Sequence, residues 1–73
     1  MKTNVSIRFN SIEEYREIES KLIELGYKEH TLIGLRRKDC IEVKINEDKT
    51  FTPLLFTFPT RKTYNSLQDF LKD

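Results

Sequence analysis

Residues 4–26 of the chain, NVSIRFNSIEEYREIESKLIELG, contain the pattern that decides the fold. Apolar and polar residues first alternate, which is the period of a strand with one buried face. Ser11 and Glu14 then form the S-x-x-E capping box that starts a helix, and the final glycine is placed to end it in a left-handed turn. The stretch therefore predicts a strand over residues 4–10 and a helix over residues 12–25. A single apolar stripe recurs along this helix at spacings of three and four, formed by Ile12, Tyr15, Ile18, Leu22 and Leu25.

The rest of the chain predicts three more strands and a second, short helix. Apolar residues suit strands over residues 31–36 and 40–46, joined by a charged three-residue turn. A longer strand is predicted over residues 50–58. Pro53 within it indicates a sheet edge or a bulge, because proline cannot donate a hydrogen bond to a central strand. A second capping signature predicts a helix over residues 67–72.

These elements predict one small α+β domain over residues 1–73. Their order is β-α-β-β-β-α, and Tyr64 is expected to end one further, brief strand. The expected architecture is a mostly antiparallel sheet with the long helix on one face and a short C-terminal helix after it. A chain of 73 residues is enough for one such domain and too short for two.

The longest predicted strand is apolar on both of its faces. Leu54, Phe56 and Phe58 share one face, whereas Phe51 and Leu55 share the other. A strand of this kind is usually covered on both sides. The short C-terminal helix or a second copy of the chain can supply the second cover, and so small a domain gains stability from a partner. We expect a homodimer, with Phe51 and Leu55 as the candidate residues for self-association.

Composition and charge exclude several classes of protein. The 13 basic and 12 acidic residues leave a net charge of +1, which gives no global field to attract a polyanion. No apolar run is long enough to span a bilayer, and residues 1–5 lead into a strand pattern without the apolar segment of a secretory signal. Cys40 is the only cysteine, so no disulfide within the chain is possible, and the cytoplasm is the expected compartment.

Residues suited to catalysis or metal binding are few. His30 and Cys40 are the only residues of their types and do not form a zinc-binding pattern, so neither a metal nor a cofactor is expected. Cys40 with His30 as its base is the candidate for nucleophilic catalysis, but no orienting third residue or oxyanion hole accompanies them. The carboxylates of the predicted helix alternate with Arg16 and Lys21, as on a solvated helix face. We therefore expect a protein that is not an enzyme.

A basic cluster is the most suggestive local feature. Arg36, Arg37 and Lys38 follow one another at the predicted hairpin turn, and Arg8 and Lys44 lie on the outward side of their strands. A charged turn that keeps a sheet soluble and its edge unpaired explains these residues, and the near-neutral net charge favours that explanation. The alternative is a patch that holds the phosphates of a nucleic acid. Its candidate members are Arg8, Arg36, Arg37, Lys38, Lys44, Arg61 and Lys62.

Four pieces of the chain are similar to small proteins of bacteriophages and prophages of low-GC bacteria. They are the strand end at residues 9–11, the Glu-Leu-Gly-Tyr step at 24–27, the Asn-Glu-Asp turn at 46–48 and the closing helix at 66–72. Together they span nearly the whole chain. The resemblance implies a viral or mobile-element origin, and it brings no catalytic or cofactor-binding residues with it.

These observations lead to two hypotheses about function. The first is a non-enzymatic interaction protein, encoded by a phage or prophage, that binds a host or phage protein or a second copy of itself. The alternative is a small regulator that binds nucleic acid through the basic hairpin patch, which requires those side chains to converge. An enzyme would require Cys40 and His30 within hydrogen-bonding reach in a cleft.

Overall fold

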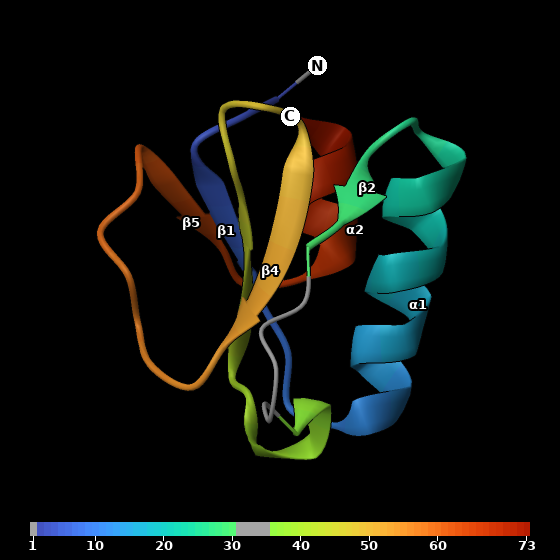
Figure 1. Ribbon diagram of the computed structural model, residues 1–73, viewed down its shortest axis with the longest axis vertical. Coiled ribbons are helices and arrows are strands. Elements are labelled where there is room, and N and C mark those ends of the chain that lie inside the picture. The colour runs from blue at the N-terminus through green and yellow to red at the C-terminus, as the bar shows by residue number, and fades with distance from the viewer. Residues whose placement is uncertain (1, 31–35) are drawn as a thin grey trace.

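The structure is a computed structural model, and it describes residues 2–30 and 36–73 (Figure 1). This part of the chain forms five strands, two α-helices and a short 3₁₀ turn, which confirms the α+β class. In chain order the elements are β1 (Val5–Arg8), α1 (Ile12–Glu24), β2 (Lys28–Glu29), the 3₁₀ turn η1 (Arg37–Asp39), β3 (Glu42–Ile45), β4 (Thr50–Leu54), β5 (Lys62–Tyr64) and α2 (Leu67–Lys72).

The strands form one sheet in the order β2-β4-β3-β1-β5. β3 pairs antiparallel with both β1 and β4, whereas β5 pairs parallel with β1 and β2 pairs parallel with β4. The sheet is therefore mixed, and the prediction of a mostly antiparallel sheet is wrong in this respect. Alternation of apolar residues carries no information on strand direction, which depends on the connections. Both parallel pairs join strands that are far apart in the chain, as parallel pairing requires.

Both helices lie on the same face of the sheet (Figure 1). Tyr15, Ile18 and Leu22 of the predicted α1 stripe are buried, and they share one core with Phe70 of α2 and with the inward side chains of β1, β3 and β4. Leu25, the last residue of the predicted stripe, is 42% exposed because it follows the end of the helix. Since α2 packs beside α1, it does not supply the second cover of the sheet, which was one of the two alternatives that the sequence left open.

The predicted helix caps are present. The Ser11 hydroxyl accepts a hydrogen bond from the Glu14 amide at 3.2 Å, and the Glu14 carboxylate accepts one from the amide of Asn10 at 2.9 Å. Gly26 follows α1 with φ of 101°, a left-handed conformation that glycine adopts without a steric cost. Ser66 caps α2 in the same way as Ser11 caps α1. These local signals therefore fix where the two helices begin and where the first one ends.

The strand predictions are confirmed in part. β3 falls within the predicted range 40–46, and β5 ends at Tyr64 as expected. The strand predicted over residues 31–36 lies outside the described residues except for Arg36, which has an extended backbone and precedes η1. β2 was not predicted, because a strand of two residues shows no alternation. The strand predicted over residues 50–58 ends at its midpoint, where the chain leaves the sheet after β4.

Pro53 lies opposite Val43 of β3. The backbone amide of Asn46 donates to the carbonyl of Thr50 at 2.7 Å, which fixes the alternation of bonded pairs along β3 and β4. By this alternation the pair of Pro53 and Val43 exchanges no hydrogen bonds, so the proline nitrogen faces away from β3. A proline is therefore tolerated at this position without loss of a ladder bond to β3.

Candidate interaction surface

Residues 55–61, called the strap below, connect β4 to β5 on the side of the sheet away from the helices (Figure 1). Three side-chain contacts attach the strap to β1 and β3. The Phe58 amide donates to Glu42 Oε1 at 2.8 Å, the hydroxyls of Thr60 and Ser6 are 3.2 Å apart, and Arg8 Nη2 donates to the Thr57 hydroxyl at 3.3 Å. The strap therefore covers the second face of the sheet, where a helix or a second copy of the chain was expected.

The strap changes the environment of the polar face of the sheet. Ser6 and Glu42, which alternation places on the outward side of their strands, are both 0% exposed. Glu42 Oε2 has no hydrogen-bond partner among the described residues, and the Nε of Arg8 lies 3.9 Å away. A buried carboxylate with an unbonded oxygen is unfavourable. Glu42 thus tethers the strap through one oxygen while its other oxygen has only a long ion pair.

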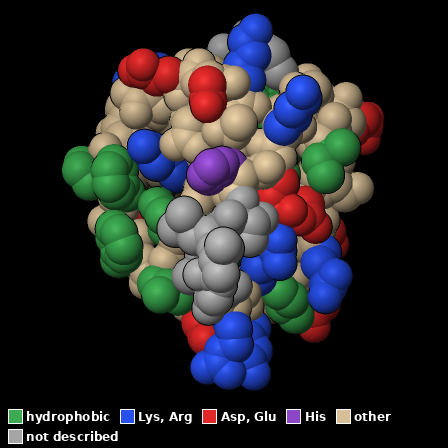
Figure 2. Space-filling view, in the orientation of Figure 1, with side chains coloured by type: hydrophobic (Ala, Val, Ile, Leu, Met, Phe, Trp, Pro, Cys, Tyr) green, Lys and Arg blue, Asp and Glu red, His purple; other side chains and the backbone are tan. Residues whose placement is uncertain are grey.

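The strap also brings large apolar side chains to the surface. Phe56 is 57% exposed and Leu55 is 50% exposed, whereas Phe58 and Leu54 are half-buried. The rings of Phe56 and Phe58 have centroids 6.3 Å apart, and Lys44 Nζ lies 4.4 Å from the centroid of the Phe58 ring. Hydrophobic side chains gather at the left of Figure 2, over the strap. We call Leu54, Leu55, Phe56 and Phe58 the strap surface.

A shallow hollow, called the sheet depression below, adjoins the strap surface. The only histidine, His30, lies near the centre of the view in Figure 2 and lines this depression. Asp48 accepts hydrogen bonds from the amide and the hydroxyl of Thr50, at 3.1 and 2.6 Å, and these bonds hold the pKa of Asp48 below its usual value. The depression is thus lined by apolar, positive and negative groups: His30, Lys44, Asn46, Asp48, Thr50, Thr52, Leu54, Phe56 and Phe58.

The two residues expected to mediate self-association lie in different environments. Phe51 is 0% exposed and belongs to the core beneath the helices. Leu55 is at the surface, because it follows the last residue of β4. The side chain of Phe51 therefore points from β4 into the core. Leu54 lies on the opposite face of β4, on the same side as Phe56 and Phe58 of the strap.

The seven basic residues of the candidate phosphate patch do not form one cluster. Arg36 pairs with Asp39 at 3.1 Å, and Lys62 pairs with Asp73 at 3.1 Å. Arg37 pairs with Glu29 of β2. Each of these cations therefore has a carboxylate partner that competes with a phosphate.

The remaining basic residues are spread along the sheet. Arg8 and Lys38 line one depression at the end of β1. Lys62 pairs with Val5 at the opposite end of that strand, and Arg61 precedes it. Lys44 lies between these ends, opposite Ser6. Because a strand rises about 3.3 Å per residue, Arg8 and Lys62 are separated by roughly 10 Å along β1.

A polar cluster that the sequence analysis missed joins α1, β2 and η1. The Tyr15 hydroxyl donates to Glu29 Oε2 at 2.8 Å, and Arg37 Nη2 donates to the same oxygen at 2.9 Å. Glu19 of α1 also approaches, with its carboxylate 3.4 Å from the Tyr15 hydroxyl. The cluster holds β2 and η1 against the first helix.

This cluster separates the pKa values of its two carboxyl groups. Burial opposes ionisation of Glu29, but hydrogen bonds from Glu19, Tyr15 and Arg37 outweigh it and lower the pKa of Glu29 to about 2. The hydrogen bond to Glu29, together with burial, raises the pKa of Glu19. Burial is the largest cause of the raised pKa of Tyr15. Glu29 is therefore the carboxylate that pairs with Arg37, and Glu19 is the neighbouring carboxyl whose ionisation the cluster disfavours.

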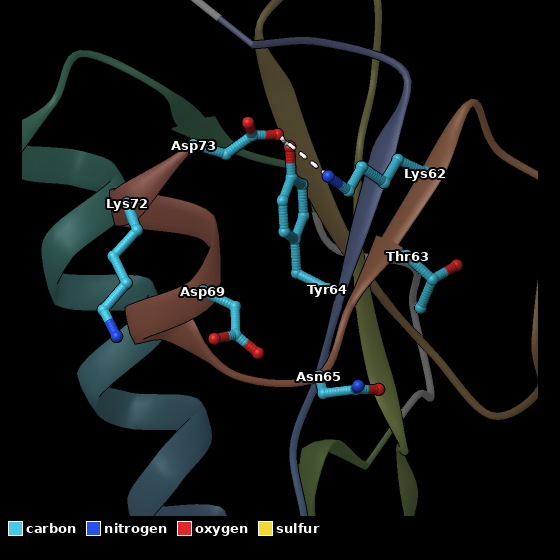
Figure 3. A pocket seen from close by; sticks show the side chains of 7 residues that line it. All are labelled: Lys62, Thr63, Tyr64, Asn65, Asp69, Lys72 and Asp73. Atoms are coloured by element: carbon cyan, nitrogen blue, oxygen red, sulfur yellow. Dashed lines mark hydrogen bonds and ion pairs between the residues drawn. The ribbon is translucent and has the colours of Figure 1, made fainter.

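A second polar depression lies between β5 and α2 (Figure 3). The Tyr64 hydroxyl donates a hydrogen bond to the Asp73 carboxylate, which also accepts one from Lys62 Nζ at 3.1 Å. These bonds lower the pKa of Asp73, the bond from Tyr64 most strongly. Asp69 and Lys72 add one charge of each sign to the lining. Tyr64 and Lys62 both bond to Asp73, so these contacts tie the residue that follows α2 to β5.

Cys40 and His30 do not form a catalytic pair in the described residues. The Cys40 thiol is 6% exposed and donates to the carbonyl of Arg36 at 3.6 Å. Burial is the main cause of the raised pKa of this thiol, which opposes formation of the nucleophilic thiolate. His30 lines the sheet depression, whereas Cys40 lines the depression beside Arg8.

Residues 2–30 and 36–73 contain no group of three or more His, Cys, Asp or Glu side chains that is arranged to hold a metal ion. Neither of the two helices there is long and apolar enough to cross a membrane.

Comparison with known proteins gives no family assignment. No family model, no curated protein and no solved structure matches this chain. The functional proposals therefore depend on the surfaces and side chains described above.

Proposed function

We propose that this chain is a non-enzymatic interaction domain that binds a protein through its strap surface. The observation that supports this most directly is the exposure of Phe56 and Leu55, 57% and 50%, beside half-buried Leu54 and Phe58. Contiguous exposed apolar side chains with polar neighbours are typical of protein contact sites. Aromatic side chains are also enriched among the residues that contribute most to binding.

The way the strap is attached supports the same proposal. Its backbone is tied to β3 through Phe58 and Glu42, and its side chains are tied to β1 through Thr57 and Thr60. A surface that is already ordered loses less conformational entropy when a partner binds. The strap surface is therefore a preorganised contact site.

We further propose that the chain is a phage or prophage product that acts in the cytoplasm of a bacterial host. Its support is the sequence resemblance at residues 9–11, 24–27, 46–48 and 66–72. The ion pairs of Arg36, Arg37 and Lys62 weigh against the nucleic-acid alternative. An experiment that detects either kind of partner separates the two.

Photocrosslinking in the native host tests the proposal. Phe56 is replaced by the photoreactive analogue benzoylphenylalanine, and Ile23 of α1, which is 55% exposed, serves as the matched control position. We expect one discrete crosslinked protein product from position 56 and none from position 23. A nuclease-sensitive product would favour the nucleic-acid alternative, and the absence of any specific product at position 56 would overturn the proposal.

A further inference from the structure

We infer that the occupant of the strap surface is a second copy of this chain, bound about a two-fold axis that passes through the sheet depression. This inference rests on the proposed function, since it names the partner of the same surface. In a two-fold interface the same patch contacts itself, so the patch must contain both members of every complementary pair. The strap surface and the sheet depression meet this requirement in shape and in charge.

The shape requirement is met by a projecting ring beside a hollow. Phe56 lines the depression while more than half of its surface is exposed. Thr52, which is buried, and Leu54, which is half-buried, also line it. A two-fold axis at this site places Phe56 of each copy against the depression of the other, where each ring replaces water over Leu54 and Phe58.

The charge requirement is met by Lys44 and Asp48, which line the same depression. Lys44 contacts the Phe58 ring and makes no ion pair with any described residue. Asp48 bonds to the neutral side chain and amide of Thr50, and nearby His30 also favours its ionised form. The two-fold axis brings Lys44 of one copy to Asp48 of the other, and the reverse contact forms at the same time.

The size of the domain fits this partner. Its accessible surface is 4721 Å², so an interface of the usual size, about 800 Å² per partner, would cover roughly a sixth of it. The molecule measures 30 × 25 × 23 Å, and one face is large enough for such a contact. A nucleic acid fits less well, because the Asp48 carboxylate lies within the contact area, and among the described residues that line it Lys44 is the one lysine or arginine.

Sedimentation velocity on the purified chain tests this inference, with folding of each variant checked by circular dichroism. We expect a dimer for the native sequence, a dissociation constant raised at least about tenfold for Phe56→Ser, and no change for Ile23→Ser. Lys44→Asp and Asp48→Lys should each weaken the dimer, and the double variant Lys44→Asp/Asp48→Lys should restore it, because the two-fold contact is then re-formed with exchanged charges.

The outcomes separate this inference from the proposed function. A native chain that stays monomeric at high micromolar concentration overturns the inference that the partner is a second copy. The proposed function is still supported in that case if position 56 crosslinks to another protein. A dimer that is insensitive to Phe56→Ser shows that the copies meet elsewhere. A double charge variant that is weaker than both single variants overturns the two-fold pairing of Lys44 with Asp48.

Discussion

The helix-covered face of the sheet and the strap-covered face are buried in different ways. On the first, Val5, Ile7 and Val43 pack against apolar side chains of the two helices. On the second, the polar side chains of Ser6 and Glu42 are covered by a connection and bonded to it. Burial of apolar area is favourable at about 25 cal/mol per Å², whereas a hydrogen bond made on folding adds only about 1 kcal/mol. The helix face therefore supplies most of the stability, and the strap face is the part that opens at least cost.

Truncation of the core ring on the helix face should give the largest effect. Phe51→Ala removes a side chain that is 0% exposed, and we expect a loss of about 3–5 kcal/mol in the free energy of unfolding. That loss is comparable with the whole stability of a small domain. Urea unfolding followed by circular dichroism measures it. The matched control on the other face, Phe56→Ala, should change the value by less than about 0.5 kcal/mol, and equal losses in the two variants would contradict the difference between the faces.

Removal of the strap tether should give the next largest effect. Glu42→Ala leaves the Phe58 amide without its acceptor, and we expect a loss of about 1–3 kcal/mol together with faster hydrogen exchange at that amide. Glu42→Gln keeps an acceptor and removes the buried charge, so its loss should be smaller than that of Glu42→Ala. Unchanged protection of Phe58 in Glu42→Ala would show that the tether does not hold the strap.

Acid should weaken the polar cluster at the edge of the helix face. The pKa of Glu29 is about 2 in the folded chain and 4.5 is its ordinary value, so the folded state binds fewer protons. The stability that Glu29 contributes is therefore present above pH 4.5 and is lost as the pH falls towards 2. Glu19, whose pKa is raised, contributes with the opposite sign and loses its contribution as the pH rises.

The test is urea unfolding as a function of pH. Glu29→Gln should flatten the loss below pH 4.5 and reduce stability at neutral pH by about 1 kcal/mol, since the ion pair with Arg37 is partly exposed. The control Glu17→Gln, on the exposed side of α1, should keep the native pH profile. Identical profiles for the two variants would contradict the role of Glu29.

The smallest effect should come from one hydroxyl on the strap face. Ser6→Ala removes the contact with Thr60 and should cost about 0.5–1 kcal/mol. Hydrogen exchange should rise at the amides of the strap while those of α1 stay protected. Equal changes in both elements would mean that the strap does not open independently of the core.

The sequence predicted the parts of the fold that depend on neighbours in the chain. The capping residues Ser11 and Ser66, the left-handed Gly26 and the buried stripe of α1 follow from local chemistry, and each is present. The strap was missed, because its large apolar residues continue the pattern of β4. Pro59 limits the predicted strand to residue 58, but nothing in the local pattern marks its actual end at Leu54.

The burial of Glu42 and the polar cluster depended on contacts between distant residues. Alternation alone predicts that Glu42 is an exposed residue on the outward face of its strand, and only the contact with the strap buries it. Glu29 and Arg37 meet Tyr15 only when β2 and η1 are placed beside α1. No period within a single element predicts such contacts, so neither the burial of Glu42 nor the polar cluster could be located from the sequence alone.

The position of β1 in the sheet has a consequence for how the chain folds. The first strand of the chain lies between β3 and β5, and both of these neighbours come from its second half. Pairing of residues far apart in the chain slows folding, because the entropy of loop closure is lost before the contacts form. During synthesis α1 has its own caps and is able to form early, while β1 has no strand to pair with until β3 has been made. We therefore expect ribosome-bound chains that end before β3 to be helical in part and to lack a stable sheet.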